Sequence, residues 1–281
     1  MHWVFRSGIC AVGVVFCASV LFHSPASANS LSGSESGVQT IHDSNSSIWV
    51  SAGESTLGYK EAVSPIPDSQ HGSLPSVAAG LNYMTGGNWY FAFEGARSFG
   101  DDTYTGAILY SDGSETPTQF TSHETITTVD GKIGRGYVLG RSVMLTPYAE
   151  IGYRYWDRNL GGGQVEDYSN FDFLAGLMGQ WSPFRRLILS AYASAGTTFA
   201  GKMETDHTTC DLDSAGMYKV GGKIGFDLTR RWEIFTALDY DHFHYVASPW
   251  VADYALGAYI MEPSSRTSDT ALRAGLSYHF M

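Results

Sequence analysis

The twelve residues Thr270–Met281, which read TALRAGLSYHFM, decide the fold of this chain. Every second residue from Leu272 to Phe280 is apolar, and the residues between them are polar, charged or small. Because side chains alternate between the two faces of a β-strand, this period of two predicts a strand with one apolar and one polar face. The strand carries an aromatic residue, Phe280, at its end.

The same alternation recurs upstream from Ser46, in segments separated by turn signals. Short connections, such as the tight hairpin turn at residues 85–88, alternate with long ones, and both ends of the barrel segment fall on the short-turn side. The pattern predicts an all-β protein: an antiparallel up-and-down transmembrane β-barrel with its apolar face turned outward. We expect ten strands, with eight strands plus a surface hairpin as the alternative.

The first of these segments does not keep a single parity. Ile48 and Val50 share one parity, whereas Leu57 and Tyr59 share the other. A β-bulge near Glu54 would place both apolar pairs on the same face of the strand. We therefore expect a bulge at this point.

Two stretches carry a resemblance to a known class of proteins. The terminal strand with Phe280, and the segment Leu145–Trp156 (LTPYAEIGYRYW), resemble strands of small bacterial outer-membrane β-barrels. Both the OmpA/OmpX-like barrels and ten-stranded barrels of omptin size fit, so no single family is indicated. The resemblance implies a bacterial outer-membrane location, with extracellular loops and both termini in the periplasm. It also implies contact with outer-membrane lipid and lipopolysaccharide, and with the barrel-insertion machinery through the C-terminal strand.

The domain organisation follows from the N-terminal residues. Residues 1–28 are expected to be a secretory signal peptide, because Arg6 precedes a short apolar run and Ala26-Ser27-Ala28 forms a cleavage site. Residues 29–45 are rich in Ser, Gly and Asn and are interpreted as a flexible periplasmic linker. Residues 46–281 are assigned to the barrel.

Charge and cysteine content exclude some functions. The formal net charge is −11 at pH 7, which disfavours nucleic acid as a partner. Cys210 is the only cysteine outside the expected signal peptide, so a disulfide framework is not predicted.

Charged residues with inward parity predict a network of ion pairs in the lumen. We expect Lys132 to face Glu150, and Arg273 to reach Asp239. Three further pairs are expected across the short turns: Arg154 with Asp130, Lys223 with Asp239, and Lys219 with Asp241. Burying these charges without partners would be very unfavourable, so the barrel is expected to be filled and closed, with a water-filled lumen as the alternative. The predicted lumen residues are Asp130, Lys132, Glu150, Arg154, Lys219, Lys223, Asp239, Asp241 and Arg273.

No catalytic residue is predicted. Ten-stranded barrels with tall loops resemble the omptin proteases, which use an Asp pair and an Asp/His pair in their outer loops. Asp101-Asp102 and Asp206-His207 lie at the corresponding places, but the members of each pair are adjacent here and would point to opposite faces. An omptin-like hydrolase remains an alternative, whereas a non-enzymatic barrel is favoured.

No metal site or cofactor is predicted either. His207 and Cys210 provide only one imidazole and one thiol locally. Asp239 and Asp241 have the opposite parity to His242 and His244, so these four side chains would not meet.

The last long loop is unusually apolar for a surface segment. A binding patch is expected there, formed by Trp250, Tyr254, Leu256 and Tyr259, unless the loop folds over the barrel mouth and buries these residues. The favoured function is a structural or surface-interaction role through the extracellular loops, with an unknown external ligand. A small-solute pore is the first alternative.

Overall fold

The computed structural model describes residues 37–62, 68–109, 114–161, 164–205, 207–254 and 257–280. Within these residues, ten antiparallel strands close into one barrel, because β1 pairs with both β2 and β14. The prediction of an all-β, ten-stranded barrel is confirmed, and the eight-strand alternative is excluded. The wall strands are β1 (Ser47–Glu61), β2 (Ser69–Met84), β3 (Trp89–Leu109), β4 (Glu115–Arg135), β6 (Val143–Asn159), β7 (Val165–Phe184), β8 (Leu187–Glu204), β10 (Gly216–Asp227), β11 (Trp232–Tyr245) and β14 (Ser265–His279).

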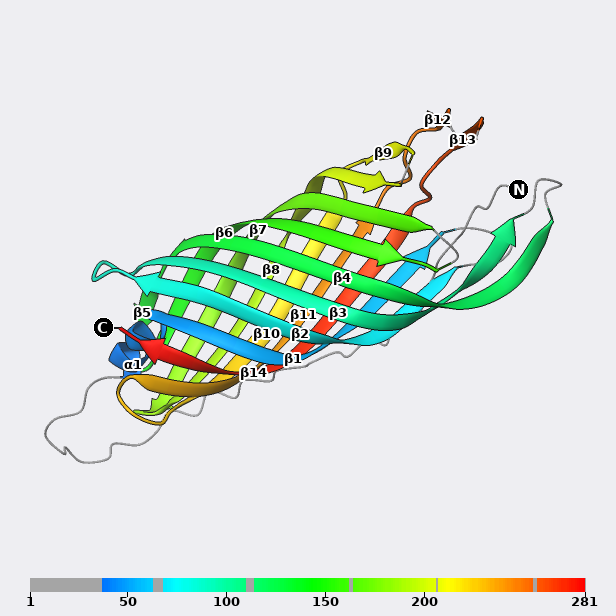
Figure 1. The fold of residues 1–281 in the computed structure, drawn as a ribbon. Coiled ribbons are helices and arrows are strands. Elements are labelled where there is room, and N and C mark those ends of the chain that lie inside the picture. The colour runs from blue at the N-terminus through cyan, green and yellow to red at the C-terminus, as the bar shows by residue number, and fades with distance from the viewer. Residues whose placement is uncertain are drawn as a thin grey trace, which may run out of the picture.

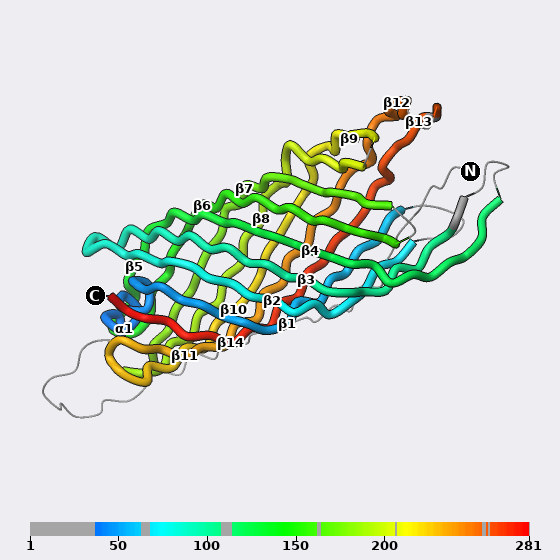
Figure 2. Tube along the Cα trace, viewed as in Figure 1, coloured from blue at the N-terminus to red at the C-terminus, as the bar shows by residue number. Residues whose placement is uncertain are grey.

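The two ends of the barrel differ in what they carry (Figures 1 and 2). Helix α1 (Gly37–Ser44) and the C-terminal strand β14 end at the short-turn side, together with the small strand β5 (Tyr137–Leu139). Strand β9 (Thr209–Leu212) and the hairpin β12–β13 (Val251–Asp253 and Ala258–Ile260) rise from the opposite, long-loop side. Among the described residues, no helix has the length and apolar character needed to cross a membrane.

Outward-facing apolar side chains cover the barrel wall. Ile151 is 56% exposed, whereas its neighbour Glu150 is 1% exposed, as alternation between an outer and an inner face requires. Large exposed apolar side chains occur on nine of the ten wall strands, all except β8, and aromatic residues gather near the short turns. These aromatic residues are Tyr83, Trp89, Tyr137, Trp181, Phe184 and Trp232. An apolar belt with an aromatic girdle is the surface that a transmembrane barrel presents to lipid.

The expected bulge in the first strand is wrong. β1 keeps an unbroken register with both neighbours, so Ile48 and Val50 face outward while Leu57 and Tyr59 face the lumen. The change of apolar parity along β1 therefore does not mark a bulge. It reflects a change in the lumen itself, which becomes apolar toward the long-loop end.

The apolar part of the lumen at the long-loop end, here called the outer core, consists of buried side chains from most of the wall strands and from β9. Val251 and Ile260, from the hairpin β12–β13, pack against it. Its aromatic centre is Trp156, whose ring lies 5.2 Å from those of both Tyr59 and Tyr168. The buried members are Leu57, Tyr59, Leu74, Ile126, Trp156, Tyr168, Leu174, Met203, Cys210, Leu212, Met217, Phe243 and Tyr245.

A second apolar cluster, the short-turn core, lies at the other end of the lumen. Ile41 of α1 is fully buried there with Met84, Tyr90 and Met144. The interpretation of residues 29–45 as a flexible linker is thus wrong for Gly37–Ser44, which form a docked helix. The apolar side chains of this helix are too few to stand out among its polar neighbours in the sequence. Residues 1–28 lie outside the described part of the chain.

Candidate functional site in the lumen

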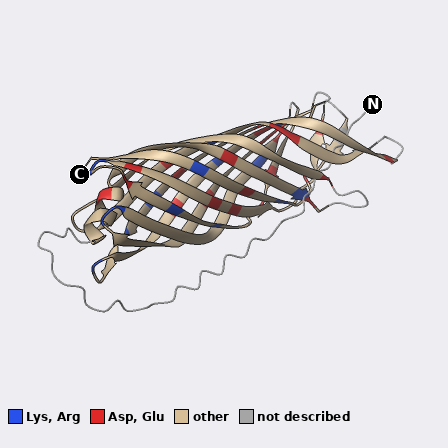
Figure 3. Cartoon of the chain, turned by 90° about the horizontal axis from the view of Figure 1, so that it is seen from below, with Lys and Arg blue, Asp and Glu red and all other residues tan. Residues whose placement is uncertain are grey.

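A layer of charged side chains lies between the two apolar cores, and Figure 3 shows residues of both signs along the middle of the barrel. All nine predicted lumen residues point inward, as the alternation of their strands requires. Several inward acids that were not predicted also pair with bases in the lumen. These are Glu94, Asp172, Glu233 and Asp269, each of which has a basic side chain within 4.0 Å.

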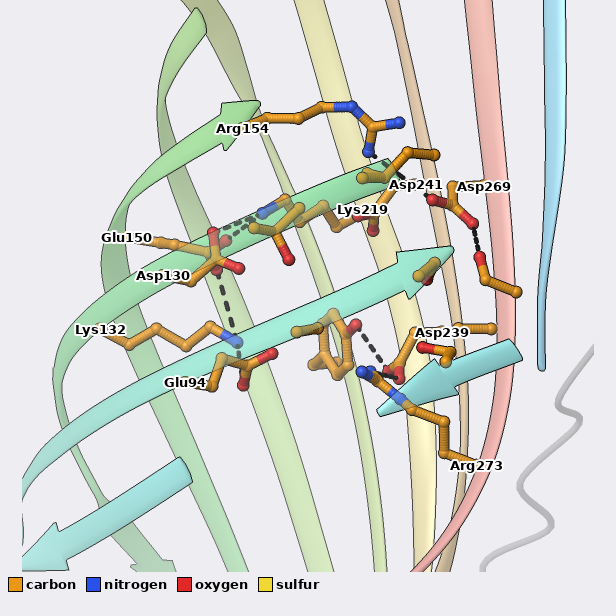
Figure 4. A pocket seen from close by; sticks show the side chains of 18 residues that line it. Glu94, Asp130, Lys132, Glu150, Arg154, Lys219, Asp239, Asp241, Asp269 and Arg273 are labelled. Atoms are coloured by element: carbon orange, nitrogen blue, oxygen red, sulfur yellow. Dashed lines mark hydrogen bonds and ion pairs between the residues drawn. The ribbon is translucent and has the colours of Figure 1, made fainter. Parts of the chain in front are cut away.

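Lys219 bridges the lumen from one wall to the other (Figure 4). Its ammonium donates hydrogen bonds to Asp130 at 2.9 Å and Glu150 at 2.7 Å, and it lies 3.9 Å from Asp172. Lys219 is on β10, whereas these acids are on β4, β6 and β7. Gly152 makes room for the cluster, because a Cβ atom at this position would meet the carboxylates of Asp130 and Asp172.

A second group lies beside this cluster. Arg273 donates to Asp239 at 2.7 Å, and the hydroxyl of Tyr192 donates to the same carboxylate at 2.9 Å. Lys132 lies 3.4 Å from Glu94, 3.8 Å from Glu150 and 5.5 Å from the ring centre of Tyr192, and so links the second group to the first. These two groups therefore form one connected network.

Two of the five expected pairs are present: Lys132–Glu150 and Arg273–Asp239. The other bases have different partners. Arg154 lies 3.6 Å from Asp269 and 5.1 Å from the ring centre of Phe243. Lys223 lies 2.6 Å from Glu233. Lys219 is in register with Asp241, but its hydrogen bonds go to the opposite wall. The expectation assumed contacts between neighbouring strands, whereas a long side chain can cross a lumen this narrow.

Two of the cavities among the described residues lie within the charged layer. One, of about 60 Å³, is lined by residues that include Glu150 and Arg154, and the other, of about 140 Å³, lies nearer the short-turn core. Arg154 Nε and Glu150 Oε2 have no hydrogen-bond partner among the described residues. Cavities of this size can hold water molecules, which would satisfy such atoms.

A second polar cluster, which the sequence analysis missed, surrounds Arg158 in the outer core. The guanidinium donates to Gln70 at 2.7 Å and Glu166 at 2.8 Å and lies 4.6 Å from the ring centre of Tyr59. Arg158 is 1% exposed, so these contacts replace its hydration. In the sequence, this cluster was indicated only by an arginine of inward parity near a strand end. Its partners lie on other strands, so they could not be identified from the local sequence.

The segment that follows the hairpin β12–β13 is anchored on this cluster. Glu262 is 5% exposed, and the hydroxyls of Tyr59 and Tyr168 lie 3.1 and 2.8 Å from its Oε1 atom. Burial raises the pKa of the Glu262 carboxyl well above its ordinary value, and the nearby charges of Glu61 and Glu166 raise it further. A neutral Glu262 is therefore favoured at the position where the outer segment meets the barrel.

The last long loop was expected either to form an exposed binding patch or to bury its apolar residues, and the structure shows some of each. Val251 and Ile260 pack against the outer core, whereas Trp250, Tyr254 and Tyr259 are 66%, 94% and 71% exposed. Leu256, the remaining member of the expected patch, lies outside the described residues. The hairpin therefore buries one face and displays aromatic rings on the other.

The residues considered for catalysis or metal binding are separated in the described part of the chain. Asp102 is buried beside Gln70, whereas Asp101 is exposed and contacts His123 on the outer surface. His207 is exposed, and Asp206 lies outside the described residues. Cys210 is fully buried in the outer core, and His242 and His244 have the opposite parity to Asp239 and Asp241.

Comparison with known proteins identifies the fold. No protein-family model matches the chain. A search of curated proteins found no match to its sequence. The structure is similar to that of the outer membrane protease OmpT from Escherichia coli, with a TM-score of 0.60 and 10% identity over 83% of this chain and 97% of that one. A weaker similarity is found to OprG from Pseudomonas aeruginosa, with a TM-score of 0.36 and 8% identity over 83% of this chain and 95% of that one. Another is found to neisserial surface protein A, with a TM-score of 0.33 and 9% identity over 83% of this chain and 97% of that one. The chain thus has the fold of bacterial outer-membrane β-barrels, and no single family is indicated.

Proposed function

We propose that this protein is a closed outer-membrane barrel that acts through its long loops, in a structural or surface-interaction role. The observation that carries the proposal is the bridge from Lys219 on β10 to Asp130 and Glu150 on the opposite wall. Such a bridge, between two apolar cores, blocks the path that a solute would follow through the lumen. This supports a filled barrel over the alternative of a small-solute pore.

The interaction surface is the exposed face of the hairpin β12–β13. Trp250, Tyr254 and Tyr259 offer large aromatic surfaces that carry a polar edge, a composition typical of binding hot spots. The opposite face of the hairpin packs on the outer core, so the rings are displayed from a fixed support. The external ligand is not identified by these features.

The orientation forms part of the proposal. Arginines lie in or next to the short turns, at Arg141, Arg185, Arg186, Arg230 and Arg231, and outer-membrane barrels carry their short turns in the periplasm. The long loops would then be extracellular, with both termini periplasmic. The barrel wall would contact lipid and lipopolysaccharide, and the C-terminal strand would contact the insertion machinery.

Cysteine labelling of intact cells tests this orientation. The variant Tyr254→Cys is expected to react with a membrane-impermeant maleimide, whereas Thr229→Cys, in a short turn, is expected to react only after the outer membrane is opened. The native Cys210 is fully buried and gives little background. The opposite labelling pattern would show that the barrel has the inverse of the proposed orientation.

Function is tested with the triple variant Trp250→Ser, Tyr254→Ser, Tyr259→Ser. Cells that display it are expected to lose attachment to surfaces or host material that cells with the wild type bind, at equal levels of heat-modifiable barrel. A matched control is Phe171→Ser, which removes an exposed aromatic residue from the wall. Cleavage of peptides by the purified barrel would instead favour the omptin-like alternative.

A further inference from the structure

Three potential metal ligands meet on the lumen face at the short-turn end. Asp227, at the end of β10, is the register partner of Glu233 at the start of β11. His279 ends β14, and its backbone N–H donates to the carbonyl of Arg231 at 2.8 Å, which fixes the strand end beside the turn. One ligand atom from each of the three side chains lies within 4.8 Å of the other two.

Two ligand atoms of this cluster are buried without a hydrogen-bond partner among the described residues. His279 is 1% exposed, and neither its Nε2 atom nor Asp227 Oδ1 has a hydrogen-bond partner among the described residues. His279 Nδ1 lies 4.0 Å from Asp227, and Nε2 lies 3.8 Å from Glu233. These separations are too long for hydrogen bonds. They are only slightly longer than the roughly 3.3 Å between ligands of a tetrahedral zinc ion with bonds of about 2.0–2.1 Å.

The surroundings hold Glu233 in place for such a role. Ser44, at the end of α1, donates to its Oε2 atom at 3.0 Å, and Lys223 lies 2.6 Å from its Oε1 atom. Gly225 makes room for the carboxylate, since a Cβ atom at this position would lie 2.6 Å from the carboxylate carbon. The ammonium of Lys223 competes with a cation for this carboxylate and would weaken its binding.

We propose that Asp227, Glu233 and His279 bind one divalent transition-metal ion of the zinc class. One imidazole nitrogen and two carboxylate oxygens form a donor set that suits zinc, whereas calcium and magnesium prefer oxygen donors alone. The ion would join β10, β11 and β14 beneath α1 and so stabilise the short-turn end. Its ligands come from three strands without a local sequence motif, which explains why sequence reasoning found no site.

Zinc binding to the untagged, full-length mature barrel in detergent tests the proposal. After chelator treatment, isothermal titration with zinc chloride is expected to show one equivalent bound and a higher unfolding temperature. His279→Gln should weaken binding at least tenfold, because loss of a ligand should cost no less than the 10- to 100-fold typical of outer-shell substitutions. Cobalt as a probe should give visible absorption bands that this variant lacks.

Three variants make the result decisive. Asp227→Asn is a second ligand variant that should also weaken zinc binding. It keeps the test possible if His279→Gln does not fold. Lys223→Met should tighten binding by removing the competing ammonium. His123→Gln removes an exposed histidine elsewhere and should leave affinity unchanged. Absence of stoichiometric zinc binding by the wild type would overturn the proposal, as would equal affinity in the wild type and both ligand variants.

Discussion

The outer core and the short-turn core fill opposite ends of the lumen, but they differ in how far they depend on residues outside the barrel wall. The outer core is made almost entirely of inward side chains from the wall strands and β9, with the hairpin β12–β13 packed on it. The short-turn core depends on Ile41, which belongs to a helix that precedes the barrel. The outer core is therefore part of the barrel itself, whereas the short-turn core includes a docked helix, which we expect to separate while the barrel stays folded.

The largest expected effect comes from removing the centre of the outer core. Trp156→Ala should lower the free energy of unfolding by about 3–5 kcal/mol, because a fully buried aromatic ring is lost. Urea titration in detergent, followed by the gel-mobility shift between folded and unfolded barrel, measures this change. Trp250→Ala is the matched control, with an expected change within about 0.5 kcal/mol.

Ile41→Ala provides the comparison between the two ends. The side chain is fully buried, but its helix can undock, so global unfolding should change less than in Trp156→Ala. Amide hydrogen exchange of residues 37–44 should accelerate, while β1 remains protected. An equal acceleration in β1 would show that the helix and the barrel wall unfold as one unit.

The charged layer between the cores should respond almost as strongly as the outer core. Lys219→Met leaves Asp130 and Glu150 buried without their shared ammonium, which should cost about 3–5 kcal/mol. Lys202→Met, at an exposed position, serves as the control in the same urea titration. Adding Asp130→Asn and Glu150→Gln to Lys219→Met should restore part of the loss, and no recovery would refute a charge-based penalty.

A smaller effect is expected from pH at the outer segment. The pKa of Glu262 is raised in the folded state, so the folded state disfavours its ionised form. The stability of this segment should therefore be greatest below the unfolded carboxyl pKa of about 4.3 and should fall as pH rises through the folded value. Glu262→Gln should remove this pH dependence and slow hydrogen exchange of β12 and β13 at neutral pH. Glu204→Gln, at an exposed position, should leave the dependence unchanged.

The sequence was sufficient to predict the barrel, its ten strands and the faces of residues such as Glu150 and Ile151, because alternation is a local property. It did not predict which charges meet. Lys219 contacts its partners across the lumen. The sequence of β10 does not indicate which residues of β4 and β6 lie at the same level along the barrel axis. The change of apolar parity at Leu57 was visible in the sequence, but it was attributed to a β-bulge in the strand. The outer core, which is the actual cause, could not be inferred from one strand.

The central claim, that the lumen is closed, is tested most directly by single-channel recording of the purified wild-type barrel in planar bilayers. The two cores and the Lys219 bridge predict no steady conductance above the bilayer background, even after insertion is verified by the mobility shift of the recovered protein. Large, long-lived current steps of uniform size would contradict this account.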